Sequence, residues 1–529
     1  RDLHSFPTRR SSDLRTWADM LSKVMCYALT GIEGYAVDVE TDISAGLTGM
    51  EIVGLAGTAV KESKERIRSA IKNSGMIYPA KRITVNLAPA DTKKDGPTFD
   101  LALAVGILAA SEQIVTKKYK EFVFLGELSL DGKLRGVCGV MPLLISAVQQ
   151  GYTRFIVPKD NAKEAAFIEG TEVFAFEKLS EVVGFLNGVE NYLPVLHTSY
   201  DSSLKTDGYD VDMSDIKGQA VAKRAVEIAV SGGHNILLMG PPGAGKTMLA
   251  RCIPTIMPDM TFEEAIEVTK IHSIAGILEA EQGIVTRRPF RTPHHTTTIP
   301  ALIGGGAKAA PGEVSLAHNG VLFLDEMPEY QRHTLESLRQ PLEDKKVTVS
   351  RVQRTVDYPA NFMLVASMNP CPCGNYGSKT AECKCTAREI RNYLGKISGP
   401  LLDRIDLQIE VDNISYGELT DRTSLETSKD VKARADKARE IQRVRFQGTN
   451  VSCNAQMTNA MIKKYCQLSD GCEKLLKRAF EKLNLSARAT TRIIKVARTI
   501  ADLDGQKDIS EKHIAEAIQY RSYDRKYHD

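Results

Sequence analysis

Residues 235–247 read Asn-Ile-Leu-Leu-Met-Gly-Pro-Pro-Gly-Ala-Gly-Lys-Thr, an apolar run that passes directly into the phosphate-loop motif G-x-x-x-x-G-K-[ST]. The residues that follow, Met-Leu-Ala-Arg-Cys at 248–252, are typical of a helix. The motif requires this order of strand, loop and helix, because backbone N–H groups of the loop and the helix N-terminus hold phosphate oxygens. The stretch therefore predicts an α/β nucleotide-binding core.

Two side chains of the motif have distinct expected roles at Mg-ATP. Lys246 is expected to reach the β- and γ-phosphates, and Thr247 to ligate Mg²⁺. The glycines let the backbone wrap closely round the phosphates. The predicted nucleotide-binding residues are Gly240, Pro241, Pro242, Gly243, Ala244, Gly245, Lys246 and Thr247.

Two further apolar runs end in polar residues that suit the same site. Residues 321–326 read Val-Leu-Phe-Leu-Asp-Glu, so Asp325 is expected to hold Mg²⁺ and Glu326 to orient and activate the attacking water. The run at 362–367 ends just before Asn369, which fits a sensor of the γ-phosphate. The alternative for Asn369 is a simple strand-terminal turn before Pro370.

Four cysteines lie close together directly after Asn369. Cys371 and Cys373 form one C-x-C pair, and Cys383 and Cys385 form a second. Four thiols at this spacing predict a closed tetrahedral zinc site. A redox disulfide pair or unligated thiols are the alternatives.

The whole chain has the composition of an ordinary globular protein. It has 529 residues, of which 43% are hydrophobic and 26% charged, and a formal net charge of +3. This length predicts two to four domains. The small net charge favours no particular partner, so nucleic-acid contacts would need local basic groups. We expect a soluble, cytoplasmic protein, because no apolar run approaches the roughly 20 residues of a membrane span.

The pattern along the chain predicts several regions. Residues 6–14 resemble a translated sequencing adapter, with a disordered basic arm as the alternative. Strand-like and helix-like runs then alternate as far as about residue 191, and a Ser-, Asp- and Gly-containing linker follows. The expected regions are a leader at 1–19, an α/β domain at 20–191, the linker at 192–212, a second α/β domain at 213–411 with the cysteine insertion at 371–385, and a helical region at 412–529.

Several longer words of the sequence resemble a known family. They are Gly31-Ile-Glu-Gly, Arg291-Thr-Pro-His-His, Pro311-Gly-Glu-Val-Ser-Leu-Ala-His and Asn369-Pro-Cys-Pro-Cys-Gly. Together they resemble the YifB/ComM family of magnesium chelatase-like AAA+ ATPases. The resemblance implies a multidomain α/β protein with a Lon-protease-like (ribosomal S5-type) N-terminal domain, an AAA+ core and a C-terminal helical lid. It also implies a homo-oligomeric ring, expected to be a hexamer, that acts on DNA as a helicase or branch-migration motor.

Two arginines take roles from the same resemblance. Arg404, within Gly399-Pro-Leu-Leu-Asp-Arg-Ile-Asp, resembles an arginine finger that completes the site of a neighbouring subunit. Arg488 resembles the second sensor, which contacts the γ-phosphate, with Arg492 as the fallback. For either finger or sensor the alternative is a solvated surface charge.

The N-terminal domain departs from the Lon pattern at both catalytic positions. Thr98 stands where Lon has its nucleophilic serine, and Met141 falls where Lon has its lysine. Methionine cannot act as a general base, so a Ser–Lys dyad cannot form. We therefore expect a retained fold without protease activity, used for assembly or for handling nucleic acid.

A basic segment is the candidate for DNA contact. Residues 345–356 alternate like a hairpin, and the predicted DNA-binding residues on it are Lys345, Lys346, Arg351 and Arg354. Basic residues at 287–295 are expected to add phosphate contacts, unless these charges only pair across subunit interfaces. Two rival functions remain: a chelatase-like motor that drives metal insertion with partner subunits, and an ATP-gated protein scaffold.

Overall fold

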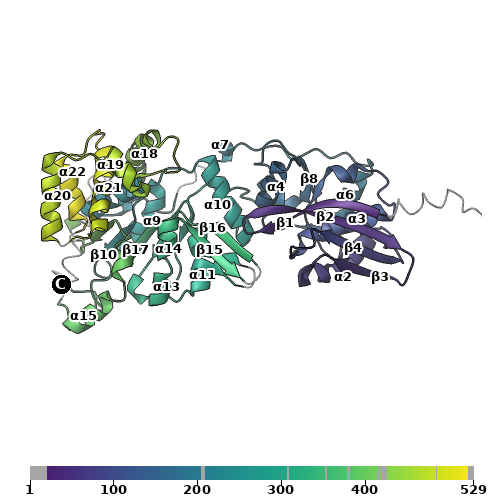
Figure 1. Cartoon of the computed structure of the whole chain (residues 1–529), viewed down its shortest axis with the longest axis horizontal. Coiled ribbons are helices and arrows are strands. Elements are labelled where there is room, and N and C mark those ends of the chain that lie inside the picture. Colours follow the sequence, from purple (N-terminus) through teal and green to yellow (C-terminus); the bar gives the residue numbers. More distant parts are fainter. Residues whose placement is uncertain are drawn as a thin grey trace, which may run out of the picture. The chain divides into compact units, whose positions relative to one another are not determined.

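The structure is a computed structural model that describes residues 21–203, 209–306, 309–351, 354–377, 382–414, 417–418, 426–483 and 485–521. The chain divides into two compact units (Figure 1). The first comprises residues 1–204 and 265–285, and the second residues 205–264 and 286–529. The expected leader at 1–19 lies outside the described residues.

The first unit is built on a seven-stranded mixed sheet in the order β3-β4-β2-β1-β5-β8-β9. β1, β2 and β4 pair antiparallel, and the remaining neighbours pair parallel. A short hairpin of β6 and β7 follows β5. The strands are β1 (Leu21–Thr30), β2 (Glu33–Ser44), β3 (Gly49–Val53), β4 (Arg82–Ala88), β5 (Val123–Phe124), β6 (Glu127–Leu128), β7 (Leu134–Arg135), β8 (Arg154–Pro158) and β9 (Glu172–Phe176).

Helices of the first unit pack on this sheet. α3 is apolar on all sides and packs on β1 and β2, which is why nearly all of its residues are buried. The helices are α2 (Thr58–Asn73), α3 (Asp100–Ala110), α4 (Val140–Gln149), α5 (Ala162–Ala165), α6 (Leu179–Leu186) and α7 (Tyr200–Ser203).

The second unit contains a five-stranded parallel sheet in the order β11-β14-β17-β10-β18. β10, which leads into the phosphate loop, lies between β17 and β18. Every residue of β10, β14 and β17 is buried, as in parallel sheets that are covered on both faces. The strands are β10 (Ile236–Met239), β11 (Phe290–Arg291), β14 (Val321–Leu324), β17 (Met363–Met368) and β18 (Leu407–Glu410).

Short helices and two hairpins surround this sheet. The expected basic hairpin is confirmed as β15 (Lys346–Arg351) and β16 (Arg354–Pro359). A smaller hairpin pairs β12 (Gly304–Gly305) with β13 (Ala310–Pro311) and packs against β15. The helices are α8 (Ala220–Gly232), α9 (Lys246–Ile256), α11 (Ile299–Ile303), α12 (Glu313–Leu316), α13 (Arg332–Glu336), α14 (Arg339–Asp344), α15 (Ala387–Leu394) and α16 (Gly399–Leu402).

The C-terminal region is helical, as expected. Side chains of Thr427, Ser469 and Ser486 accept hydrogen bonds from backbone N–H groups and so cap three of the helices. α18 and α21 pack against α8 and share its hydrophobic core, so the helical region and the sheet form one compact unit. The helices are α18 (Ser428–Arg445), α19 (Asn459–Tyr465), α20 (Asp470–Lys482), α21 (Ala487–Leu503) and α22 (Glu511–Gln519).

One helix carries the chain from the second unit into the first. α10 (Phe262–Ala275) starts in the second unit, but residues 265–285 belong to the first. The hydroxyl of Ser273 donates to the buried carboxylate of Glu164 at 2.5 Å and accepts from the Gly139 N–H at 2.9 Å. The sequence predicted one continuous core over 213–411, because periodicity carries no sign of these long-range partners. Among the described residues, no helix has the length and hydropathy that a membrane span needs.

Candidate nucleotide-binding site

The phosphate loop connects β10 to α9 through two glycines in the left-handed region. Gly243 and Gly245 have φ values of +80° and +85°, which side-chain-bearing residues rarely adopt. No heavy atom lies within 4 Å of the position that a Cβ would take at either residue. α9 begins at Lys246, so its N-terminus directly follows the loop. This geometry leaves room for phosphate oxygens beside the loop backbone.

Lys246 is buried beneath the loop, with an exposed fraction of 9%. Its ammonium donates to the carbonyl oxygens of Gly240 and Pro241 at 2.8 and 2.9 Å, and to Oδ1 of Asn369 at 3.1 Å. Burial lowers the pKa of Lys246, and the nearby carboxylate of Asp325 acts in the opposite direction. A buried cation held by neutral oxygens is well suited to an incoming phosphate anion.

The predicted magnesium ligands lie together although 78 residues separate them. The hydroxyl of Thr247 donates to Oδ2 of Asp325 at 3.0 Å. A hydroxyl and a carboxylate oxygen are hard ligands of the kind that Mg²⁺ prefers, and both reach the end of the loop. The residues present therefore fit a magnesium ion that bridges them to a nucleotide.

Ser367 in β17 is a further member of this site that the sequence reasoning missed. Its hydroxyl donates to Oδ1 of Asp325 and accepts from the Glu326 N–H at 3.2 Å. A buried serine inside the apolar run 362–368 was the signal that could have revealed it. Ser367 thus orients both acidic residues that follow β14.

Glu326 is exposed and has a φ of +50°, which is rare for a residue with a side chain. Its N–H also bonds to Oδ1 of Asp325 at 3.1 Å. Residues held in this region of φ cluster at functional sites, where the surrounding structure sustains the strain. The carboxylate lies outside the buried network below it and is accessible to water.

Asn369 follows β17 and lies beside the loop, as the sensor hypothesis requires. The Gly240 N–H donates to the carbonyl of Met368 at 3.2 Å, so the loop and the end of β17 are joined through their backbones. The bond from Lys246 to Asn369 adds a side-chain link at the same level. Asn369 thus lies beside the loop, and its role as a sensor stays a prediction.

The four predicted zinc ligands form one cluster. The sulfur atoms of Cys371, Cys373, Cys383 and Cys385 all lie within 4.8 Å of one another. Three of the S–S separations are 3.4, 3.6 and 3.7 Å, and a tetrahedral zinc with 2.3 Å bonds would need about 3.8 Å. Backbone N–H groups of Asn375 and Lys384 lower the pKa of Cys373 to about 6. The cluster therefore fits a tetrahedral, thiolate-ligated metal.

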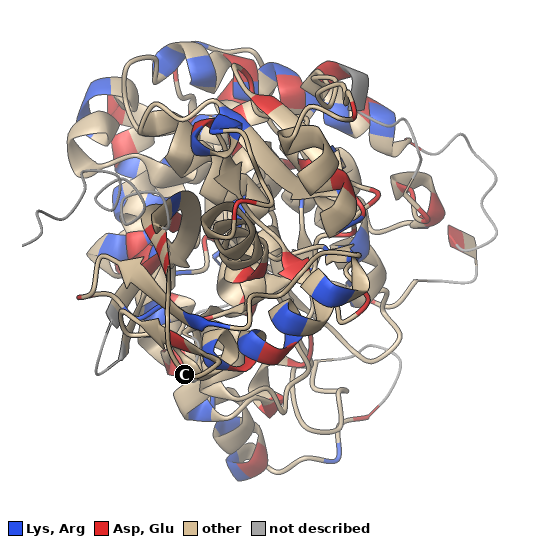
Figure 2. Ribbon diagram, turned by 90° about the vertical axis from the view of Figure 1, so that its right-hand side faces the viewer, with Lys and Arg blue, Asp and Glu red and all other residues tan. Residues whose placement is uncertain are grey.

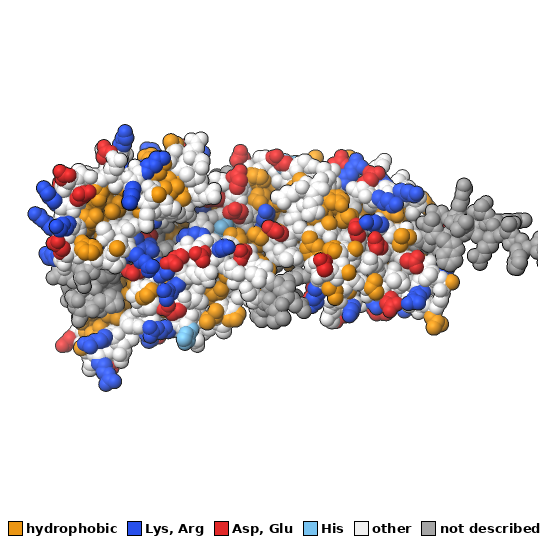
Figure 3. All heavy atoms as spheres, viewed as in Figure 1, with side chains coloured by type: hydrophobic (Ala, Val, Ile, Leu, Met, Phe, Trp, Pro, Cys, Tyr) orange, Lys and Arg blue, Asp and Glu red, His pale blue; other side chains and the backbone are white. Residues whose placement is uncertain are grey.

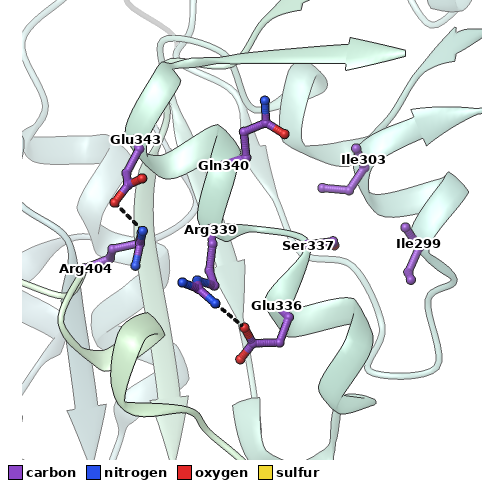
Figure 4. A pocket seen from close by; sticks show the side chains of 8 residues that line it. All are labelled: Ile299, Ile303, Glu336, Ser337, Arg339, Gln340, Glu343 and Arg404. Atoms are coloured by element: carbon purple, nitrogen blue, oxygen red, sulfur yellow. Dashed lines mark hydrogen bonds and ion pairs between the residues drawn. The ribbon is translucent and has the colours of Figure 1, made fainter. Parts of the chain in front are cut away.

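Arg404 is buried at the edge of a pocket of about 530 Å³ (Figure 4). Its guanidinium forms an ion pair with Glu343 and donates to the carbonyl of Pro400. Burial lowers the pKa of Arg404, as do the charges of Arg339, Arg488 and Arg492. Arg404 is thus paired within its own subunit, and the alternative of a solvated surface charge does not describe it.

The two sensor candidates differ in environment. Arg488, at the start of α21, is exposed, and its charge acts on Arg404. Arg492 forms an ion pair with the buried Asp406, which also contacts the ring of His234 at 3.2 Å. Burial raises the pKa of Asp406, but Arg492 and His234 outweigh this and hold the pKa below its ordinary range. Arg492 therefore joins α21 to the core, which leaves Arg488 as the stronger sensor candidate.

The basic residues proposed for DNA contact separate into three groups. Arg351 and Arg354 are direct partners across the hairpin, and their side chains lie outside the described residues. Lys346 is exposed and pairs with Asp357 at 3.1 Å. Lys345 precedes the hairpin at the end of α14, where burial lowers its pKa. Lys345 is thus partly buried at the hairpin base, and its contact with phosphates stays a prediction.

Two arginines of the 287–295 cluster have partners inside the second unit. Arg288 pairs with Glu264 at 2.9 Å and donates to the carbonyl of Asn319 at 2.6 Å. Arg291 makes two bonds to Glu313, at 2.6 and 2.8 Å. Several donors of both arginines are therefore used within the fold, and their contact with phosphates stays a prediction.

The two Lon-like positions of the first unit do not supply a nucleophile and a base. Met141 is fully buried, and its N–H donates to Glu164 at 2.8 Å. Thr98 lies in the short 3₁₀ turn of Pro97–Phe99.

Three family models match the chain and together cover most of it. "Magnesium chelatase, subunit ChlI" matches residues 212–419, and "Magnesium chelatase, subunit ChlI C-terminal" matches 425–521. "Subunit ChlI of Mg-chelatase" matches residues 39–161. Part of the chain is also similar to the Lon protease of Trichlorobacter lovleyi, at 27% identity over 26% of this chain and 17% of that protein.

Two relatives match along nearly the whole length. Competence protein ComM of Haemophilus influenzae is 44% identical, over 95% of this chain and 97% of its own. Protein YifB of Escherichia coli is 44% identical, over 96% of this chain and 98% of its own. With the phosphate-loop geometry described above, this similarity shows that the chain belongs to the YifB/ComM family of magnesium chelatase-like AAA+ ATPases.

Proposed function

We propose that this protein is a ring-forming motor that hydrolyses ATP and acts on DNA. The observation that carries the hydrolysis is the convergence of Lys246, Thr247, Asp325 and Asn369, which come from the ends of three neighbouring parallel strands. Ligands of open parallel sheets bind at the carboxyl ends of the strands, where these side chains lie.

Each residue of this set has a defined task. Lys246 exchanges its carbonyl partners for the β- and γ-phosphates, while Thr247 and Asp325 hold the magnesium ion that accompanies ATP. Glu326 orients a water molecule for in-line attack on the γ-phosphate and takes up its proton. Asn369 contacts the γ-phosphate and connects it to the end of β17. Ser367 holds Asp325 and Glu326 in position.

The ring assignment rests on Arg404 and its surroundings. The positive charge that neutralises the transition state must come from outside the phosphate loop. Arg404 supplies this charge to the site of a neighbouring subunit. Its ion pair with Glu343 would then open when subunits meet. Arg488 acts with Arg404, the C-terminal helices serve as the lid, and a hexamer is the expected ring.

The DNA role rests on local charge and on one relative. Basic and acidic residues are interspersed along the ribbon in Figure 2, and their side chains are interspersed over the face drawn in Figure 3. A broad basic surface is therefore lacking among the described residues of that face. A hairpin with arginines at its turn, repeated in a ring, would contact a phosphate backbone without reading bases. The relative from Haemophilus influenzae is named a competence protein, which favours DNA as the partner.

The N-terminal domain is proposed to have the Lon-like, ribosomal S5-type fold without protease activity, for assembly or DNA handling. The ten cysteines all lie within the described residues and form no disulfide, which suits a reducing compartment such as the cytoplasm. The four-cysteine cluster is proposed to hold zinc as a structural ion.

The deciding experiment measures the ATPase rate with and without forked, single-stranded and duplex DNA. A rate that rises with DNA supports the motor. An ATPase rate that is unchanged by DNA but rises with chelatase partner subunits would favour metal insertion. This is the second candidate function because of the match to the magnesium chelatase family model. ATP binding without either response would favour a scaffold.

A further inference from the structure

The cysteine cluster touches the phosphate loop through a glycine. Gly374, between Cys373 and Asn375, has a φ of +80°. A Cβ at this residue would lie 2.4 Å from Cδ and 2.8 Å from Cγ of Pro242, the third residue of the loop. Cβ atoms essentially never approach so closely, so only glycine lets the cysteine turn pack on the Pro242 ring.

The backbone of this turn is fastened to the first ligand. The Gly374 N–H donates to the carbonyl of Cys371 at 3.0 Å, and the Tyr376 N–H donates to its sulfur at 3.3 Å. Cys371 is fully buried and follows Asn369 by two residues. The position of the turn therefore depends on where the Cys371 sulfur is held.

The segment after the cluster returns to the same place. α15 begins at Ala387, two residues beyond Cys385, with Thr386 as its cap. Its residue Tyr393 is buried, which raises the pKa of its hydroxyl, and the backbone N–H of Asn369 acts on that pKa in the opposite direction. The chain thus leaves Asn369, passes through the thiols and comes back to Asn369.

We propose that metal occupancy of the four cysteines sets how tightly the loop binds nucleotide. The inference rests on the ATP site proposed above and names its regulation. A tetrahedral ion fixes four thiolates at once, and through Gly374 it holds Pro242 and the loop in the conformation that accepts phosphates. Without the ion the turn loses this support, and part of the binding free energy is spent on ordering the loop.

The first test compares the zinc-loaded chain with the same chain after its zinc has been removed. A mercurial and a chelator release the metal, and a thiol then removes the mercurial from the cysteines. Binding of a fluorescent ATP analogue with Mg²⁺ is expected to weaken about tenfold and to recover when Zn²⁺ is added back. Linkage is reciprocal, so Mg-ATP is expected to slow the transfer of zinc to a colorimetric chelator. A preparation that contains no metal and has four reactive thiols would overturn the proposal.

The second test keeps all four thiols. Gly374→Ala is expected to retain one metal per chain but to weaken nucleotide binding, because the methyl group displaces Pro242. Gly448→Ala is the matched control, since Gly448 has a φ of +79° and nothing lies within 4 Å of its Cβ position. Equal nucleotide affinity in the zinc-loaded, zinc-stripped and Gly374→Ala proteins would overturn this inference but leave the proposed ATP site standing. If no form binds nucleotide, the proposed function fails as well.

Discussion

The ammonium of Lys246 donates a 3.1 Å hydrogen bond to the side-chain oxygen of Asn369, which lies 123 residues further along the chain. This bond joins the phosphate loop to the end of β17. A γ-phosphate that enters the site would compete for the same ammonium. Nucleotide binding is therefore expected to remove this partner of Asn369.

Lys246→Ala is expected to abolish ATP binding, whereas Glu326→Gln should bind ATP with nearly unchanged affinity. Loss of water activation should lower kcat by at least about 100-fold. Glu329→Gln is the control, because this exposed carboxylate pairs with Lys396 rather than with the site. The test measures the steady-state ATPase rate and the nucleotide affinity of each variant. A wild-type rate in Glu326→Gln would refute the proposed role of Glu326.

Arg404→Ala is expected to bind ATP but to hydrolyse it roughly 10³-fold more slowly, because transition-state charge at the neighbouring site is left without its cation. Mixing this variant with Lys246→Ala should restore part of the activity, since each supplies what the other lacks. Arg332→Ala, an exposed arginine on α13, serves as the control. Absence of recovery in mixed assemblies would remove the finger role from Arg404.

Glu164→Gln is expected to change the pH dependence of stability. Burial raises the pKa of Glu164, partly offset by bonds from Ser273 and the Met141 N–H. A carboxyl whose pKa is raised in the folded state binds more protons there, so it lowers stability as pH rises above the ordinary value of about 4.3.

The amide oxygen of the new side chain in Glu164→Gln would keep the Met141 and Ser273 bonds, which both go to Oε1 in the wild type. The NH2 group of that side chain would lose the 3.4 Å bond that Asn161 donates to Oε2, a cost that does not depend on the charge of Glu164. Relative to wild type, the variant should therefore gain stability as the pH rises from 4 to 8. Denaturant unfolding of the full chain at several pH values measures it. A difference that does not vary with pH would show that Glu164 does not titrate in the folded protein as proposed.

Replacing Arg351 and Arg354 together by alanine is expected to weaken DNA binding and to flatten its dependence on salt, because fewer counterions are released. Basal hydrolysis should stay unchanged. The control replaces Arg443 and Lys512 by alanine. Their side chains are 79% and 82% exposed, and this double substitution removes the same amount of positive charge. Titrations with forked DNA at several salt concentrations provide the test. Unchanged binding would make the hairpin structural.

Local sequence determined the parts of the site that are contiguous in the chain. The phosphate loop, the strand before it and the helix after it lie within residues 235–256, so their order alone identified Lys246 and Thr247. The runs that end at Asp325 and Asn369 were recognisable because buried parallel strands are apolar throughout. The cysteine spacing likewise indicated a metal site before any geometry was known.

Only the tertiary structure decided which distant residues meet. Ser367 bonds Asp325, Glu343 pairs with Arg404, and Gly374 packs on Pro242, yet none of these pairs follows from a local pattern. The departure of α10 towards Glu164 was hidden for the same reason. Periodicity reports which face of an element is buried, but the partner on that face depends on strand order and chain crossings, which are set by the packing of the whole unit.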